Sequence, residues 1–238
     1  MLGYDHATMG AIAGLATMPE DKGLAYQAAW VATWTVAALW ADFDMAGSSA
    51  ARTWGPLTQT ASGALGRLVG GHRWGTHDVV LAPAVLYWVL VPLAQQLLWG
   101  RYLLVALLLG LALRTFLKPG SLSDLSNLVL SSFGSWWLVS HDLDLQLPLA
   151  GILAMGVWVH TLGDLPTTEG LPVPVVWIFT RQRFSIPLFK VGGMVETRLV
   201  APALSAVLVL IANQRLSWLN LPLPALFAPG SMPIHLPF

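Results

Sequence analysis

Residues 79–100 form a stretch of 22 positions without a charged side chain. A helix of about 20 apolar residues crosses the hydrocarbon core of a bilayer. Further apolar runs cover residues 24–41, 102–113, 125–140, 145–163 and 199–212, and a shorter one covers residues 7–18. Because only 10% of the chain is charged, against about 25% in soluble domains, these runs predict an all-α, polytopic helical bundle in the membrane. We expect about five or six spans and a short N-terminal half-span.

The whole chain, residues 1–238, is predicted to form one membrane-embedded domain, since 55% of its residues are hydrophobic. The two long connections, residues 42–78 and 164–198, are expected to form the functional site, because long loops in compact domains are often functional. Residues 214–238 form a proline-rich tail. The chain has no cysteine, which excludes disulfides and thiolate metal sites, and its zero net charge gives no sign of a nucleic-acid partner.

The polar residues between the apolar runs fall on one face of this bundle when successive runs cross the membrane in turn. That face receives His6, Asp42, Asp44, His72, His77, His160 and Asp164. It also receives the larger share of the basic residues: Arg52, Arg67, Arg73, Arg114, Lys118, Arg181, Arg183, Lys190 and Arg198, against Lys22, Arg101 and Arg215 on the other face. Under the positive-inside rule, this excess predicts that the His/Asp face is cytoplasmic.

Three motifs, together with His6, supply these histidines and aspartates. Asp42 and Asp44 end an apolar run, where carboxylates oppose the helix dipole, so a bound cation would help to explain them. GHRWGTHD, residues 71–78, holds two histidines that can converge in a glycine-containing turn. His160 and Asp164 are four residues apart and would share one face of a helix. Each motif alone could also be explained without a metal, as a solvated loop or a His–Asp hydrogen bond. Three such motifs on one face, however, predict a shared metal site.

The ligand chemistry indicates the kind of metal. Imidazole and carboxylate groups suit zinc, manganese or iron. Because there are more than four candidate ligands, we expect a divalent metal, zinc foremost, with two ions in the site. Two ions about 3.5–4 Å apart can clamp the attacking and leaving oxygens of a phosphoester displacement, and one ion can lower the pKa of a bound water so that hydroxide forms near neutral pH.

The ordered motifs resemble those of the bacterial YdjM-like family of membrane-bound, metal-dependent hydrolases. HRWGTHD, residues 72–78, resembles the family's HRGxTHS signature, and ADFD, residues 41–44, resembles its PDIDH. HTLGDLPTTEGLPVPVVW, residues 160–177, resembles its SHxxxDxLTxxGxxxLxP block, and RFSIPLFKVGGMVE, residues 183–196, resembles the stretch that follows. His6 matches the family's early histidine, so the resemblance covers residues 4–200.

The resemblance implies a multi-pass inner-membrane hydrolase, and it carries the metal-ligand role onto the seven histidines and aspartates named above. Glu196 corresponds to the acidic residue of the last block, and Glu196 or Asp78 is expected to orient water as a general base. Met45 departs from the family, which has a histidine there, and Asp78 replaces a serine. Asp78 would compensate as a ligand or orient His77. A remote similarity of the HxxxD element to zinc-dependent phospholipases C favours phosphoester chemistry.

The expected substrate follows from the place of the site. Four basic residues are candidates for binding a substrate phosphate: Arg73, Arg181, Arg183 and Lys190. The simpler explanation for them is the general excess of basic residues on the cytoplasmic side of membrane proteins. A site at the membrane face predicts a lipid or lipid-linked phosphoester as the partner. The alternatives are a protein that binds or transports a divalent metal and a structural membrane protein without hydrolase activity. A transporter would place polar groups near midspan on broken helices with repeat symmetry, and no convincing repeat is present.

Overall fold

The computed structural model describes residues 1–118, 120–143 and 147–216, so most of the predicted proline-rich tail lies outside the described residues. Its main helices are α1 (Gly3–Ala16), α2 (Leu24–Ala37), α3 (Pro56–Leu68), α4 (Leu81–Val85), α5 (Val91–Gln96), α6 (Leu98–Arg114), α7 (Ser121–Ser140), α8 (Leu149–Asp164), α9 (Trp177–Thr180) and α10 (Ala201–Leu216). Short 3-10 turns cover η1 (Trp40–Asp44) and η2 (Gly75–His77), and π-helical turns cover η3 (Leu86–Leu90) and η4 (Glu196–Val200). The predicted helical class is confirmed.

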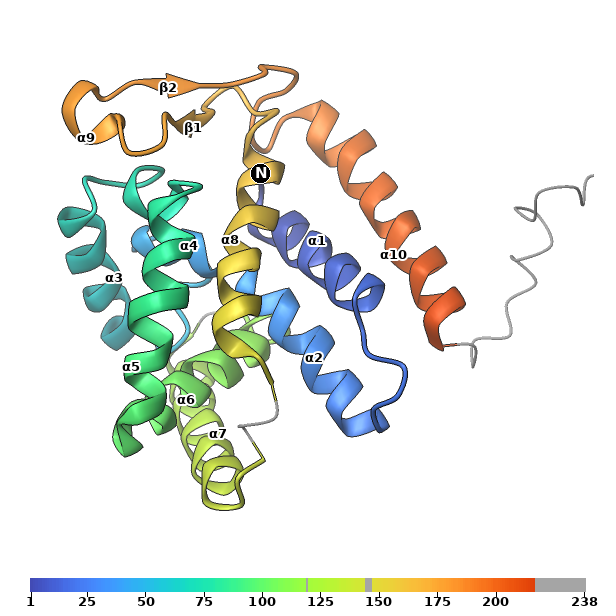
Figure 1. Ribbon diagram of the computed structural model, residues 1–238. Helices are drawn as coiled ribbons and strands as arrows, with labels where there is room; N and C mark the ends of the chain where they lie inside the picture. The colour runs from blue at the N-terminus through green and yellow to red at the C-terminus, as the bar shows by residue number, and fades with distance from the viewer. Residues whose placement is uncertain (119, 144–146, 217–238) are drawn as a thin grey trace, which may run out of the picture.

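Helix α8 occupies the centre of the bundle. Figure 1 shows it with α1 and α2 on one side and with α4 and α5 on the other. Its buried residues Ile152, Leu153 and Val157 belong to the same hydrophobic core as Val36 of α2 and Leu111 of α6. The burial of these side chains removes apolar surface from contact with water or lipid and packs it at interior density. The C-terminal end of α8 thereby becomes the fixed support for His160 and Asp164.

Gly156 permits a close approach between α2 and α8. A Cβ atom at position 156 would lie 2.4 Å from Cβ of Ala37 and 2.6 Å from the Ala37 carbonyl oxygen. Small residues at a helix crossing let two backbones come together, as they do in membrane helix pairs. The consequence reaches the predicted site, because η1, which carries Asp42 and Asp44, follows directly after α2.

Two π-helical turns each precede a proline. The turn Leu86–Leu90 ends two residues before Pro92, and the turn Glu196–Val200 ends two residues before Pro202. Proline has no N–H to donate and its ring collides with the preceding turn of a regular helix. A wider π turn relieves that collision while the chain keeps helical direction. Both helices therefore continue through their prolines.

The predicted span 79–100 is broken at Leu97, three residues before its expected end. The helical run Leu81–Gln96 and α6 meet at a bend of 118°. Leu97, between them, has an extended backbone with φ −97° and ψ 122°. Gly100 packs against Ala94, and a Cβ there would lie 2.6 Å from the Ala94 carbonyl oxygen, so glycine allows the tight reversal.

Fewer helices are long enough to cross a bilayer than the apolar composition of the sequence suggests. Among the described helices, Glu196–Leu216 is long and apolar enough to cross a bilayer, and the bent pair Leu81–Gln96 and Leu98–Arg114 would add one more. Helices α1 and α2 have 14 residues each, below the roughly 17 that a span needs. Helix α7 has 20 residues but carries buried Asn127, Ser131 and Ser135. The expected five or six spans stay a prediction.

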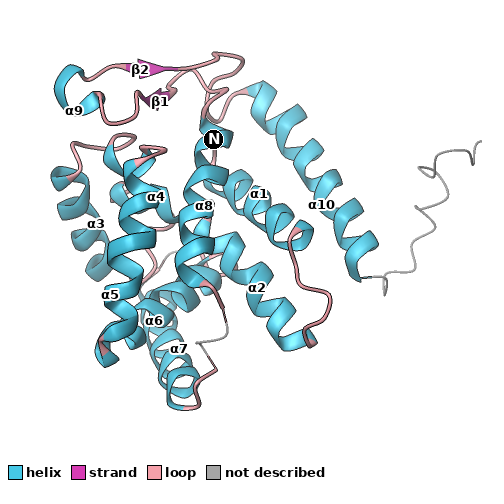
Figure 2. Ribbon diagram, in the orientation of Figure 1, coloured by secondary structure: helices cyan, strands magenta, loops and turns pink. Residues whose placement is uncertain are grey.

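The connection 164–198 forms a cap over the C-terminal end of α8 (Figure 2). Within it, β1 (Leu171–Pro172) and β2 (Arg183–Phe184) pair antiparallel, with Leu171 opposite Phe184. These two short strands, which the all-α prediction did not include, hold the cap together by backbone hydrogen bonds. The α9 turn lies between the strands in the chain. The cap places Arg183 of β2 beside the loop before η2. The Arg183 guanidinium donates a hydrogen bond to the His72 carbonyl oxygen in that loop.

Candidate metal centre

The seven histidines and aspartates predicted as ligands converge under this cap. They come from α1, η1, the loop before η2, η2 itself and the last turn of α8: His6, Asp42, Asp44, His72, His77, His160 and Asp164. His77 and His160 approach each other across 83 sequence positions. We call this set the His/Asp cluster. The convergence on one face that the sequence pattern predicts is therefore present in the fold.

One part of the cluster joins α1 to α8. Ligand atoms of His6, His160 and Asp164 all lie within 4.8 Å of one another, and all three residues are buried. His6 stacks on His160 with 3.6 Å between ring centroids, and His6 Nε2 lies 3.3 Å from Asp164 Oδ1. Neither ring nitrogen of His6 has a hydrogen-bond partner among the described residues, and neither does Asp164 Oδ2. Buried polar atoms without partners are costly, so these atoms fit the donor set of a metal ion.

A second part of the cluster joins η1 to η2. Ligand atoms of Asp42, His72 and His77 also lie within 4.8 Å of one another. Asp44 supports this group from behind, because its Oδ1 accepts a 2.7 Å hydrogen bond from His72 Nδ1 and its Oδ2 accepts one from the Thr76 hydroxyl. Outer partners of this kind orient metal ligands and set their tautomers. Asp44 therefore has a supporting geometry, whereas Asp42 faces the histidines.

The two parts meet at four atoms. His77 Nε2 and His160 Nε2 are 3.1 Å apart. Asp164 Oδ2 lies 3.6 Å from the first nitrogen and 3.5 Å from the second, and Asp42 Oδ1 lies 3.8 and 3.7 Å from them. Ligands that surround a zinc ion at about 2.0–2.2 Å in a tetrahedron lie roughly 3.4 Å apart. The four atoms, two from each group, therefore have the spacing of metal ligands.

Hydrogen bonds determine which ring nitrogens carry protons. His160 Nδ1 lies 2.7 Å from the Ala38 carbonyl oxygen, which only accepts, so Nδ1 carries the hydrogen. The Thr76 hydroxyl donates to Asp44, so its oxygen accepts from His77 Nδ1 at 3.0 Å. When both rings are neutral, each therefore presents a bare Nε2 to the other. In that state, two nitrogen lone pairs and two carboxylate oxygens form a set of acceptors that a cation completes.

The electrostatics of His77 and Asp44 suit metal ligands at neutral pH. Burial lowers the pKa of the His77 imidazole below its usual range, and the neighbouring His160 lowers it further, against the opposing effects of Asp44 and Asp42. Burial alone would raise the pKa of the Asp44 carboxyl, but the hydrogen bond from His72 and the neighbouring His77 imidazole outweigh it and hold that pKa below its usual range. A neutral imidazole beside ionised carboxylates is the protonation state that metal binding requires.

Asp78 has a different position from the one expected for a ligand or a general base. Its Oδ1 accepts hydrogen bonds from the backbone N–H groups of Val80 and Leu81, at the start of α4. Its Oδ2 accepts from the Val175 N–H at 2.7 Å and from the Trp177 indole at 2.8 Å. Four donors leave the carboxylate little capacity for metal or water. The geometry supports a positioning role for Asp78, which ties the cap to the start of α4, and not compensation for Met45.

Glu196 is also engaged by backbone donors. Its Oε1 accepts a 2.6 Å hydrogen bond from the Leu2 N–H, and its Oε2 accepts a 2.5 Å bond from the Gly192 N–H. The side chain is fully buried. These contacts join the start of α1 to the end of the cap and to η4. Glu196 therefore positions the helix that carries His6, which argues against the expected role of orienting water.

The four basic residues predicted as a phosphate clamp occupy distinct places. Arg73 is buried, and its guanidinium donates to Asp164 Oδ1 and the Thr167 hydroxyl at 3.0 Å each. Arg181 and Arg183 lie over the Trp74 ring, with Cζ 5.0 and 4.2 Å from its centroid. Lys190 is exposed. Arg73 thus neutralises part of the cluster, while Arg181 and Arg183 form a basic rim beside it.

A polar cavity opens next to the cluster. It has a volume of about 460 Å³, and its lining includes Asp44, His72, Arg67 and Arg181. Four glycines, at positions 63, 66, 70 and 71, also line it. The cavity therefore brings an imidazole of the cluster and a guanidinium of the rim to one space, which suits an anion.

Sequence reasoning missed Thr76 and the Ala38 carbonyl, which orient the two central histidines. Thr76 contacts both Asp44 and His77, and its signal in the sequence is that it matches the threonine of the HRGxTHS signature directly before His77. The Ala38 carbonyl has no side-chain signal at all, since its role depends on the packing of α2 against α8. Thr167, the partner of Arg73, lies in the TT pair of the cap motif.

Comparison with known proteins gives one significant result. No curated protein and no solved structure matches the chain. The family model described as YdjM inner membrane protein matches residues 1–232, which is nearly the whole length. The match includes every member of the His/Asp cluster, from His6 to Asp164, and extends through the cap and α10. The chain therefore belongs to the YdjM inner membrane protein family.

Proposed function

We propose that this inner-membrane protein is a metal-dependent hydrolase that cleaves a phosphoester of a lipid or lipid-linked substrate. The observation that carries the proposal is the convergence of four potential ligand atoms at the centre of the cluster, His77 Nε2, His160 Nε2, Asp42 Oδ1 and Asp164 Oδ2. A purely structural histidine pair would place a hydrogen bond donor between its nitrogens. Here the donors Nδ1–H are used elsewhere, on Ala38 and Thr76.

The residues that would hold metal are those of the two groups described above. His6, His160 and Asp164 would hold one ion, and Asp42, His72 and His77 a second. A divalent ion, with zinc foremost and manganese or iron as alternatives, supplies Lewis-acid chemistry that makes water nucleophilic near neutral pH. Asp44 and Thr76 hold the tautomers of His72 and His77, and the Ala38 carbonyl holds that of His160.

The reaction that this arrangement suits is a hydrolytic displacement at phosphorus. The oxygen of water forms a bond to phosphorus, the bond from phosphorus to the leaving alkoxide oxygen breaks, and a proton from water ends on the alcohol. Arg181 lines the polar cavity beside His72, and Arg183 lies over the neighbouring Trp74. Their guanidinium groups would bind the non-bridging phosphate oxygens, for which the geometry of arginine is well suited. The enclosed place of the cluster restricts access of bulk water.

The test is metal analysis combined with an activity screen on the full-length purified protein. We expect about two equivalents of transition metal per chain, and hydrolysis of phosphate mono- or diesters that stops on chelation and returns with zinc or manganese. Metal at full occupancy with no ester cleaved across the screen would favour the alternative of a metal-binding or structural membrane protein. Absence of metal from protein purified without chelators would overturn the site itself.

We further propose that the chain crosses the membrane several times with the cluster facing the cytoplasm. The nine basic residues assigned to the cluster face, against three on the other, support this orientation. The absence of cysteine makes the proposal testable with single introduced thiols. A membrane-impermeant maleimide added to intact cells is expected to label Asp21→Cys and to leave Ser49→Cys unlabelled until the membrane is opened. Both positions are exposed, so the reverse pattern would contradict the orientation.

A further inference from the structure

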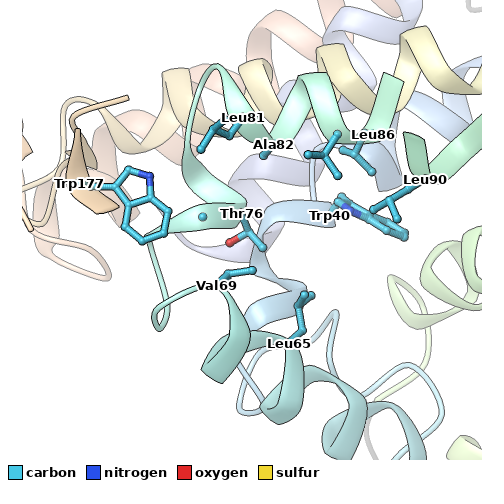
Figure 3. A pocket seen from close by; sticks show the side chains of 11 residues that line it. Trp40, Leu65, Val69, Thr76, Leu81, Ala82, Leu86, Leu90 and Trp177 are labelled. Carbon is cyan, nitrogen blue, oxygen red and sulfur yellow. The ribbon is translucent and has the colours of Figure 1, made fainter. Parts of the chain in front are cut away.

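An apolar groove runs along the outer side of the cluster. It has a volume of about 310 Å³. Figure 3 shows Leu81, Ala82 and Leu86 on one wall, Leu65 and Val69 on the other, and Trp40 and Trp177 at the two ends. The upper wall comes from α4 and η3, and the lower wall from α3. The groove therefore lies between two segments that the sequence separates, and not within a single helix pair.

The groove continues toward the α5–α6 bend. A second cavity of about 260 Å³ shares Trp40, Leu86 and Leu90 with the first. Beyond these shared residues it is lined by apolar side chains of α5 and α6, including Leu93 and Ala94. Two cavities that share three lining residues form one elongated apolar path. Its shape suits a flexible chain more than a compact ring system.

One polar side chain connects this path to the cluster. Apart from the two indoles, Thr76 is the one lining residue of the first groove with a polar side chain. Its hydroxyl contacts both Asp44 and His77. The Trp177 indole N–H is already bonded to Asp78, so this end of the groove presents ring carbon. An occupant of the groove would therefore reach the cluster at Thr76, which lies between the two ends of the groove (Figure 3).

Positive charge lies at the Trp177 end of the groove. Arg181 Cζ is 5.7 Å from the ring centroid of Trp177, which closes the groove. The Arg181 guanidinium donates to the Gly70 carbonyl, and the Arg183 guanidinium donates to the His72 carbonyl. Both cations are thus held by backbone acceptors beside the polar cavity that contains His72. A molecule with an apolar chain and an anionic head matches this arrangement in both shape and charge.

We propose that the groove binds one hydrocarbon chain of a phosphate-bearing lipid and places the phosphate in the polar cavity between His72 and Arg181. This inference rests on the proposed hydrolase function and names its substrate class as an amphiphile recognised by chain and phosphate together. An extended peptide is a poorer occupant, because its amide groups need partners and the lining side chains offer few. Ala82, whose small side chain keeps the groove open beside Thr76, is the specificity-determining residue.

The first experiment measures binding without requiring catalysis. The full-length protein is exposed to an alkyl phosphate that carries a photoreactive diazirine on its chain, and the labelled peptides are identified by mass spectrometry. We expect labels on the segment 81–94, and Ala82→Phe should reduce them by about tenfold, since added ring atoms overfill the groove. Val89→Phe is the matched control, because Val89 is half exposed and lies outside the groove lining. The inference would be overturned if the corresponding alkyl alcohol labelled the groove as strongly as the alkyl phosphate. It would also be overturned if the alkyl phosphate labelled Ala82→Phe as strongly as the parent protein.

The second experiment separates the groove from the hydrolase proposal. Nitrophenyl alkyl phosphate diesters with chains short enough to stay monomeric are offered in a length series. In the parent protein and in Val89→Phe, kcat/KM should rise about fourfold for each methylene that enters the groove, and in Ala82→Phe this slope should be lost. Cleavage without any dependence on chain length would overturn the groove while the hydrolase stands. Labelling of the groove without cleavage of any diester would overturn the hydrolase function while the binding site stands.

Discussion

Replacement of His77 by alanine is expected to remove metal from both parts of the cluster. His77 Nε2 lies 3.1 Å from His160 Nε2 and 3.6 Å from Asp164 Oδ2, so it contacts the first group as well as its own. Metal content should fall from about two ions per chain to fewer than one. Any phosphoesterase activity should fall by more than about 100-fold. Mutation of a residue that only hydrogen-bonds a metal ligand typically lowers activity by less than this.

Two variants make this result specific. His72→Ala should retain one ion, because His72 belongs only to the second group and its side chain is 30% exposed. His141→Ala should retain both ions, since His141 is exposed at the end of α7 and donates to the Trp137 carbonyl. Plasma emission spectroscopy gives the metal content, and circular dichroism shows whether each variant is folded. Unchanged metal in folded His77→Ala and Asp164→Ala proteins would disprove the site.

Substitution of Gly156 by alanine is expected to damage the same site from a distance. The new Cβ would lie 2.4 Å from the Ala37 Cβ, so α2 and α8 must separate. Overpacking of this kind costs typically about 1–3 kcal/mol. The separation would also shift the Ala38 carbonyl away from His160 Nδ1, which it now contacts at 2.7 Å. We therefore expect a lower unfolding temperature together with a lower metal affinity.

Gly151 on the same helix is the matched control. A Cβ at position 151 would meet no atom within 4 Å. Gly151→Ala should keep full metal content and gain stability of up to about 1 kcal/mol from helix propensity. Thermal unfolding in detergent and metal titration of the two purified variants give the comparison. Equal behaviour of Gly156→Ala and Gly151→Ala would show that the α2–α8 approach does not determine the geometry of the site.

The helical class and the membership of the cluster could be predicted because both depend on local sequence. Apolar runs predict helices whatever packs against them, and the spacing of His160 and Asp164 places both on one helix face. The order of the motifs resembles the family whose model matches the chain. Element boundaries were less accessible, since the break at Leu97 depends on Gly100 packing against Ala94 rather than on the charge of Arg101.

The roles of individual acidic residues could not be predicted in the same way. Asp78 stands next to His77 in the sequence, yet its oxygens turn to α4 and the cap. Glu196 lies in a family motif, yet it bonds the backbone of Leu2 and Gly192. Sequence neighbours can point in different directions, because side-chain direction depends on backbone geometry at each position. Only the packed structure separates a carboxylate that faces the histidines from one that joins two loops.

The sequence by itself determined that this chain forms apolar helices and brings a particular set of histidines and aspartates to one end of them. Both properties follow from residue types and their spacing along the chain. The tertiary structure alone decided which nitrogen of His77 and His160 is bare, because that depends on Thr76 and on the Ala38 carbonyl. It alone placed an apolar groove beside the cluster, because the walls come from α3 and α4, which are separate in sequence and meet only through packing.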